Sequence, residues 1–312
     1  MNYKDPGPIL IAIGILLLLV GIAAALLGPV EMYCFYLFSE GGRFHYEGFG
    51  FGSFMFGNIA CQILGYYVIA WLCIPLGYGH LHMRRWARTL AVTLLWFWLV
   101  VGMPLVIVFF FILVASKDLS PVAVLIAAIL LALSYLVAPG LLIRFYRSPK
   151  VRLTFETKDP NSYGIERLPM PTLVLCVLYL FYAIVLHVPI FFKGLFPFFG
   201  IFLFDLQGIL LIDVSIALLI GLAWGTLKRR AWAWWGAVIY FGLMACSAML
   251  TFLKSSYLDI LSGMRFPPTE MEALDGVPLQ GFHLAVFFGI PLLITWGLIV
   301  LSKRYFQTEK PL

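Results

Sequence analysis

Residues 9–27 read ILIAIGILLLLVGIAAALL, a run of 19 residues without a charged or strongly polar side chain. A hydrocarbon core of about 30 Å requires roughly 20 apolar residues in a helix. The run is longer than the apolar core of a signal peptide, which has about 7–15 residues. The segment before it holds only Lys4 beside Asp5, a weak basic start. We therefore interpret the run as the first membrane-spanning helix.

Similar apolar runs recur through the rest of the chain, to a total of eight. Membrane β-strands would give short alternating segments instead, and only helices and closed barrels satisfy their backbone groups in lipid. The sequence therefore predicts an all-α fold, a polytopic transmembrane helical bundle with eight spans. The expected spans are 8–28, 53–79, 87–115, 121–143, 172–192, 198–226, 231–253 and 282–302.

The composition supports this interpretation. Of the 312 residues, 62% are hydrophobic and 12% are charged, whereas soluble domains have about 45–50% apolar and about 25% charged residues. So few charged side chains cannot cover a soluble globule. The composition excludes a soluble enzyme, a nucleic-acid-binding domain and a disordered tail.

The positions of Lys and Arg predict an orientation. With the N-terminus inside, 16 of the 21 fall in inner segments and 5 in outer ones. Cytoplasmic loops retain Lys and Arg, so we expect the N-terminus and the C-terminus inside the cell. This explains the net charge of +6 without nucleic acid, and it predicts anionic lipid headgroups as partners on the inner face. We expect an integral membrane protein of the cytoplasmic membrane of a prokaryote.

One stretch of sequence occurs twice. Residues 79–92 read GHLHMRRWARTLAV and residues 225–238 read GTLKRRAWAWWGAV, with seven identities in fourteen positions. The pattern predicts a tandem, parallel duplication of a four-helix unit. The first repeat is 1–143, the cytoplasmic linker is 144–171 and the second repeat is 172–312.

Basic and aromatic residues of this motif fall where spans leave and re-enter the membrane. Arg meets headgroups and Trp favours the interface, so we interpret them as contacts to lipid headgroups. A site for an anionic ligand, in a lipid-binding protein or an intramembrane enzyme, is another hypothesis. The residues are Arg84, Arg85, Trp86, Arg229, Arg230 and Trp232. We also expect His80 and His82 to lie at this interface.

Polar residues within the spans are the candidates for chemistry. The set consists of Asp213, Asp205, His187, Asn58 and Gln62. A carboxylate at a helix centre costs about 2.5–3.5 kcal/mol and normally faces the bundle interior or a water-filled cavity. Ala217 and Gly221 follow Asp213 at intervals of four, and small residues mark close helix contacts. We therefore expect Asp213 to border a packed seam.

Three loops are long enough to fold. In the linker, Pro149 is expected to begin a short amphipathic helix with Val151 and Phe155 on one side. The outer loop 29–52 carries His45 and Glu47, which we interpret as solvated rather than metal-binding.

The outer loop 254–281 is interpreted as a lid or an interaction surface. In this loop Thr269 is expected to cap a short helix with Glu270 in its first turn.

The sequence has no recognisable catalytic, cofactor-binding or metal-binding motif: it lacks H-E-x-x-H and a Gly-rich phosphate loop with an adjacent Lys. We expect a non-enzymatic, multi-pass protein, an accessory, scaffolding or assembly subunit of a membrane complex with protein partners. The alternative is an ion- or proton-coupled small-molecule transporter that uses Asp213 as its intramembrane carboxylate.

Overall fold

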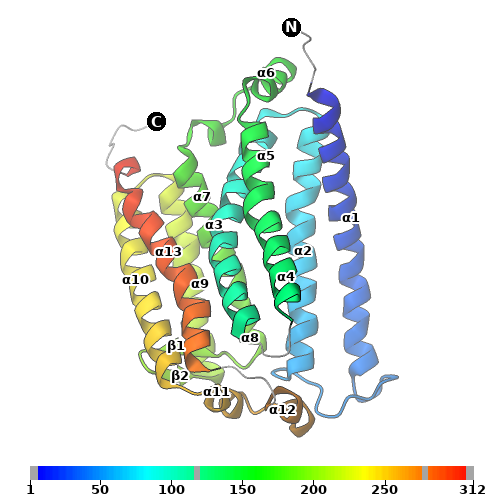
Figure 1. The fold of residues 1–312 in the computed structure, drawn as a ribbon, viewed down its shortest axis with the longest axis vertical. Helices are drawn as coiled ribbons and strands as arrows, with labels where there is room; N and C mark the ends of the chain where they lie inside the picture. The colour runs from blue at the N-terminus through cyan, green and yellow to red at the C-terminus, as the bar shows by residue number, and fades with distance from the viewer. Residues whose placement is uncertain (1–5, 116–119, 276–279, 307–312) are drawn as a thin grey trace.

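The structure is a computed structural model that describes residues 6–115, 120–275 and 280–306. Over these ranges it holds eight helices that are long and apolar enough to span a membrane (Figure 1), so the chain is a multi-pass helical bundle. The spans are α1 (Gly7–Phe38), α2 (Phe54–Leu81), α3 (Arg85–Ala115), α4 to α5 (Pro121–Tyr146), α7 (Met170–Val185) with α8 (His187–Phe191), α9 (Asp205–Leu227), α10 (Ala231–Lys254) and α13 (Gly281–Leu301).

The first span is longer than expected. It was predicted to end at residue 28, but α1 continues through Pro29 to Phe38. A proline removes one backbone donor and often ends a helix. Membrane helices tolerate such a proline, because neighbouring groups satisfy the carbonyl that it leaves free.

The sixth span begins later than expected. Residues 198–204 were predicted to be helical, but an antiparallel hairpin of β1 (Phe196–Phe198) and β2 (Ile201–Leu203) precedes α9. Gly200 in its turn has φ of 101°, which favours glycine. The turn amides of Phe199 and Gly200 donate to hydroxyls of Ser247 and Thr251 on α10, each at 2.9 Å. The hairpin turn is therefore held by residues that are distant in sequence, and an apolar run does not predict such a turn.

Two spans contain irregular turns. In the fourth, a π-turn (Leu133–Val137) joins α4 (Pro121–Ala132) to α5 (Ala138–Tyr146), just before Pro139. A proline ring clashes with the carbonyl four residues earlier, and a wider turn relieves that clash. The fifth span is interrupted at Leu186, between α7 and α8.

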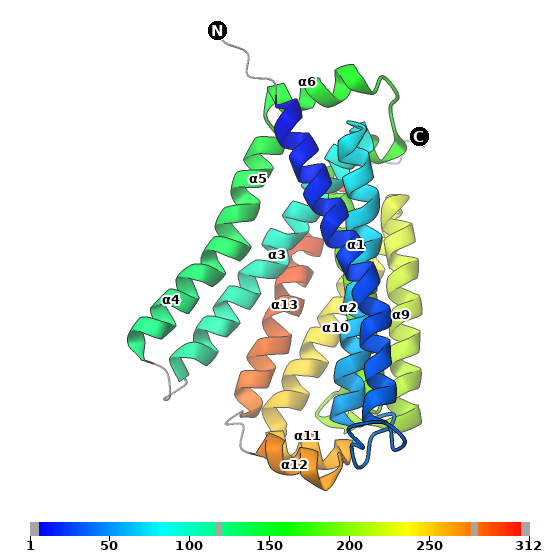
Figure 2. The ribbon, with the colours of Figure 1, turned by 90° about the vertical axis from the view of Figure 1, so that its right-hand side faces the viewer.

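The helices pack in pairs around α3. α1 packs on α2, α7 packs on α9, and α10 packs on α13, while α3 contacts α5, α7 and α13. Figure 2 shows α4 and α5 leaning away from α1, α2 and α9, with α3 running beside them. One apolar core centres on Leu178, Leu219 and Phe241 of the second half. Another centres on Leu10, Ala91 and Phe155 and joins the first half to the linker.

The two copies of the repeated sequence form turns of the same geometry. Met83 has φ of 49° and Arg229 has φ of 55°. The next residue in each turn donates its N–H to the glycine carbonyl, Arg84 to Gly79 at 2.7 Å and Arg230 to Gly225 at 3.0 Å. The sequence likeness therefore extends to the local backbone, whereas the common origin of the two halves remains a prediction.

Short helices cover both ends of the bundle. α6 (Pro149–Lys158) lies across one end in Figure 2, and Val151 and Phe155 are buried on one side, so the linker helix is confirmed. The opposite end carries α11 (Tyr257–Met264) and α12 (Pro268–Asp275). α12 begins at Pro268, and the predicted cap rests on the side chain of Thr269, which lies outside the part of the chain that the structure describes. Two single 3₁₀ turns, η2 (Gly164–Arg167) and η3 (Lys303–Tyr305), complete the fold.

Candidate functional site

The acid at the middle of α9 lies on the outside of the bundle. α9 buries the row Gly208, Ile212, Ser215, Leu219, Leu222 and Thr226. Asp213 lies beside that row and is exposed, as is Ala217 one turn further along. A Cβ added at Gly221 would meet no atom within 4 Å. We call Asp213, Ala217 and Gly221 the acidic face of α9.

The expected packed seam at Asp213 is therefore wrong within this chain. A helix advances by about 100° per residue, so a row spaced by four residues drifts away from a face that alternates steps of three and four. The buried face of α9 follows the larger side chains Ile212, Leu219 and Leu222. The small residues Ala217 and Gly221 lie beside that face: Ala217 is exposed, and among the described residues no neighbouring helix approaches the Cβ position of Gly221 within 4 Å.

The other polar candidates do not gather around Asp213. Asn58 on α2 is exposed and Gln62 is half-buried. Asp205 is exposed at the start of α9, and the ring Nδ1 of His187 donates to the carbonyl of Ala183 at 2.9 Å. Among the described residues, Asp213 forms no hydrogen bond or ion pair with any of them. No group of three or more His, Cys, Asp or Glu in the described ranges could hold a metal ion.

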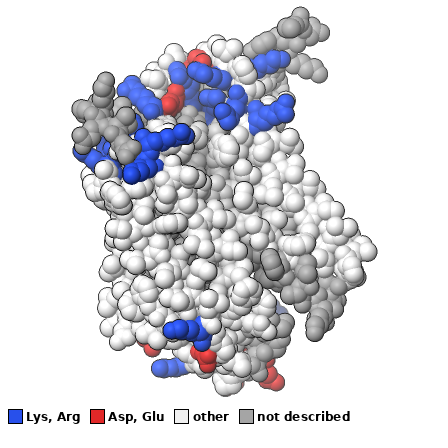
Figure 3. Space-filling model, turned by 60° about the vertical axis from the view of Figure 1, so that its left-hand side comes forward, with Lys and Arg blue, Asp and Glu red and all other residues white. Residues whose placement is uncertain are grey.

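Lys and Arg gather at one end of the bundle, as Figure 3 shows. We call it the basic end. It includes Arg84, Arg85, Arg88, Arg144, Arg147, Arg152, Arg167, Lys228, Arg229, Arg230, Lys303 and Arg304.

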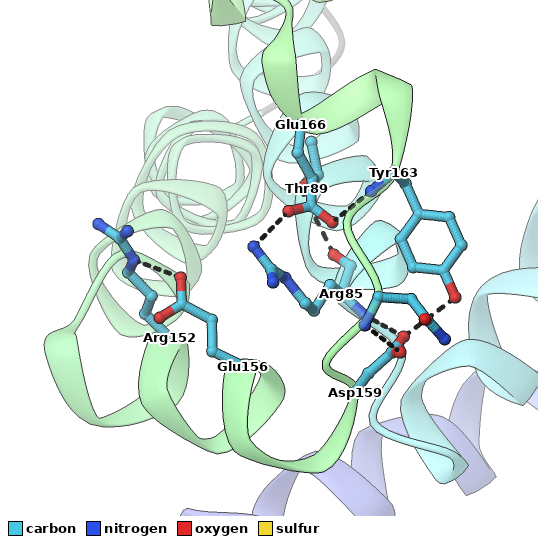
Figure 4. A network of polar contacts seen from close by, with 8 residues as sticks. Arg85, Thr89, Arg152, Glu156, Asp159, Tyr163 and Glu166 are labelled. Atoms are coloured by element: carbon cyan, nitrogen blue, oxygen red, sulfur yellow. Dashed lines mark hydrogen bonds and ion pairs between the residues drawn. The ribbon is translucent and has the colours of Figure 1, made fainter.

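At this end the linker is tied to the turn between α2 and α3 (Figure 4). Nη1 of Arg84 lies 3.7 Å from Oδ1 of Asp159, and Nη2 of Arg85 lies 2.8 Å from Oε2 of Glu166. Two of the expected headgroup contacts therefore also pair with acids of the linker.

Asp159 is the centre of this network. It is only 1% exposed, and its carboxylate accepts hydrogen bonds from the backbone N–H of Arg85 at 3.3 Å and from the hydroxyl of Tyr163 at 3.1 Å. Burial on its own raises the pKa of a carboxyl. The two hydrogen bonds, a third from the N–H of Asn161 and the charge of Arg84 together outweigh burial, so the pKa of Asp159 lies below its ordinary value.

His80 is not interfacial, in contrast to the prediction for it. It is fully buried between α2 and α5, where Nδ1 lies 2.7 Å from the carbonyl of Leu76 and Nε2 lies 2.7 Å from the hydroxyl of Tyr146. Its neighbour His82 is exposed. Both histidines were predicted to be interfacial, but they lie two residues apart on the helix and so point to opposite sides of its end.

The matching residues of the second half are more open. Arg229 donates from Nε to the carbonyl of Tyr305 at 2.8 Å. Arg230 and Trp232 are exposed, while Trp86 is half-buried beside Gly79. A lipid headgroup can therefore reach Arg230 and Trp232 directly.

A carboxylate from the opposite end caps α2. Glu270 of α12 is 3% exposed, and its two oxygens accept the backbone N–H groups of Phe54 at 2.7 Å and Met55 at 3.0 Å. Its Oε1 also accepts the hydroxyl of Tyr46 at 3.1 Å. Negative charge at a helix N-terminus is stabilising, so Glu270 fixes α12 on the start of α2. The sequence could not reveal this pairing, which joins residues more than 200 positions apart.

No known protein family, curated protein or solved structure matches the chain. The candidate sites are therefore the acidic face of α9, the network at the basic end and the Glu270 cap.

Proposed function

We propose that the chain is an accessory, scaffolding or assembly subunit of a membrane complex and that the acidic face of α9 contacts another membrane protein. The observation that carries the proposal is the outward position of Asp213. It is the ninth residue of a helix of 23, about 12 Å from the helix start at 1.5 Å per residue. A carboxylate at such a depth normally faces protein or water. A partner protein on this face would provide one of these two environments for Asp213.

The residues next to Asp213 fit a protein partner. Ala217 is exposed, and nothing contacts the Cβ position of Gly221. Membrane helices associate through small residues at this spacing, because their backbones can approach closely, and polar side chains hydrogen-bond across the contact. A lipid chain gains nothing from a row of small residues and cannot hydrogen-bond a carboxyl group.

The transporter hypothesis has less support. It requires the carboxylate of Asp213 to face a water-filled cavity within the chain. Asp213 instead lies on the outside of the bundle, and it lines neither of two cavities at the basic end nor one beside Gly52 at the other end. We therefore favour a protein contact at Asp213 and propose no catalytic role for the chain.

We also propose that the basic end faces the cytoplasm of a prokaryotic cell and that both termini lie there. The support is the gathering of Lys and Arg at this end (Figure 3). We propose, in addition, that the halves arose by tandem duplication. The matching turns at Gly79 and Gly225 support this.

Cross-linking in native membranes tests the proposed contact. A photoreactive amino acid at Ala217 is expected to give one discrete protein adduct. The same residue at Leu16, which is 61% exposed on α1, is the matched control and is expected to give lipid adducts. Lipid adducts at both positions would refute a protein partner on α9.

A further inference from the structure

A cavity of about 490 Å³ opens at the basic end, where the two halves of the chain meet. Pockets of about 300–1,000 Å³ are the usual size for small ligands. α3 forms one wall, and α7 and α13 form the other. The lining includes Arg88, Val92, Trp96, Val100 and Arg147.

A second cavity of about 580 Å³ adjoins the first on the side of α5. The two share Trp96 and Arg147, and the second adds Arg144. We call these two adjoining cavities the α3 groove. Its mouth carries three arginines, Arg88, Arg144 and Arg147, and its walls are otherwise mostly apolar.

Among the described residues, the arginines at the mouth have no ion-pair partner within the groove. No acidic residue lines either cavity in the part of the chain that the structure describes. Nearby acids are already paired, Glu156 with Arg152 at 2.7 Å and Glu166 with Arg85 at 2.8 Å. Within the described ranges, the exposed side chain of Arg147 forms no ion pair or hydrogen bond.

Arg88 is positioned to bind without moving. It is half-buried, and its Nε donates to the carbonyl of Tyr146 at 3.1 Å. A guanidinium has five donors in a fixed fork, so this bond fixes the group and leaves its remaining donors for a ligand. Planar arginine forks match phosphate oxygens, and such charged bonds are stronger than neutral ones.

The depth of the groove matches one leaflet of a bilayer. From Arg88 to Val100 the helix rises by about 18 Å, and half of a hydrocarbon core of about 30 Å is about 15 Å. Val92, Trp96 and Val100 occur at intervals of four along this path. An amphiphile with its headgroup at the arginines would therefore place one apolar chain along α3.

We propose that the α3 groove is a binding site for an anionic phospholipid of the leaflet at the basic end. The phosphate is held by Arg88 and Arg147, and one acyl chain lies between α3 and the pair α7 and α13. Basic pockets between membrane helices bind anionic headgroups in this way. Because the walls come from both halves, the bound lipid also joins them.

Native mass spectrometry of the full chain tests the proposal. The chain is released from nanodiscs that contain equal amounts of phosphatidylglycerol and phosphatidylcholine, and the lipid retained on it is weighed. Wild type is expected to retain phosphatidylglycerol in preference. Arg147→Gln is expected to lower that preference at least about tenfold, the loss of one charged hydrogen bond. Its side chain has no partner within the described protein, so the variant is expected to fold.

Matched variants separate the groove from general attraction to the basic end. Arg167→Gln removes an exposed arginine of the linker outside the groove and is expected to retain lipid as wild type does. Val100→Trp fills the apolar end and is expected to lower retention while the arginines remain. Equal retention of the two lipids by wild type, or equal loss in Arg147→Gln and Arg167→Gln, would overturn the proposal. Displacement by inorganic phosphate alone would also overturn it, because a held acyl chain resists that exchange.

Discussion

Nε2 of His80 lies 2.7 Å from the hydroxyl of Tyr146, and this contact joins α2 to α5 in the interior of the basic end. Nδ1 of the same ring lies 2.7 Å from the carbonyl of Leu76, which can only accept. Nδ1 therefore carries a proton, and in a neutral ring Nε2 accepts the hydroxyl of Tyr146. The histidine thus acts as a buried, fully satisfied link between helices.

His80→Ala is expected to destabilise the bundle. It leaves the hydroxyl of Tyr146 buried without its partner, which costs about 1–3 kcal/mol, and it opens a cavity where the ring lay. The fall in Tm, measured in one detergent, gives the effect. His82→Ala is the control, because His82 is exposed. Equal Tm values for the two variants would show that His80 does not stabilise the bundle.

Glu270→Ala is expected to loosen the start of α2. The change removes the acceptor of the Phe54 and Met55 amides, a loss of about 1 kcal/mol by analogy with other helix caps. Hydrogen exchange at these two amides should therefore accelerate. Glu272→Ala removes an exposed acid from the same helix and should leave them protected. Unchanged exchange in Glu270→Ala would contradict the cap.

Acid is expected to release the linker from the α2–α3 turn. The folded pKa of Asp159 is lowered from 3.8, so its ionised form is favoured by folding. A lowered pKa contributes stability above the unfolded value, and this contribution is lost as pH falls through the folded value. Proteolysis by pepsin should therefore cut residues 159–168 increasingly as the pH drops below about 3.8.

Asp159→Asn is expected to show the same release at neutral pH, detected with a protease active there. Glu156→Gln is the control, because its pair with Arg152 is at the surface and such pairs contribute little. A linker equally resistant in Asp159→Asn and Glu156→Gln would contradict the role of Asp159.

Because the two turns have the same geometry, replacing the glycine of either turn by alanine is expected to lower stability to a similar extent. A Cβ at Gly79 would lie 2.5 Å from Cβ of Ala87, and one at Gly225 would lie 2.6 Å from the ring of Trp232. Alanine at either position should therefore lower the Tm to a similar extent. Gly65→Ala meets nothing within 4 Å and should raise stability by about 0.5–1 kcal/mol, the usual gain within a helix. A large cost at only one of the two turns would count against their equivalence.

The sequence predicted the eight spans because each requires only a sustained apolar run. It misplaced some ends, since the hairpin before α9 depends on hydroxyls of Ser247 and Thr251 on another helix. It also placed His80 at the membrane interface, although packing against Tyr146 buries it.

The candidate site was predicted in part. Asp213 was identified by its residue type within an apolar run, but its outward direction follows from which face of α9 packs. Larger neighbours such as Ile212 and Leu219 decide that face. The Glu270 cap and the α3 groove could not be foreseen, because both depend on contacts between distant segments.

The most direct measurement of the proposed role is the protein mass, without bound detergent, of the particle that mild detergent releases from native membranes. The chain alone has a mass of 35.2 kDa. A subunit that meets its partner through α9 gives a larger particle of fixed stoichiometry in wild type and in Leu16→Ala on α1. Asp213→Leu then gives the chain alone. A wild-type particle with a protein mass of 35.2 kDa would contradict the proposal. An Asp213→Leu particle with the same protein mass as the wild-type particle would also contradict it.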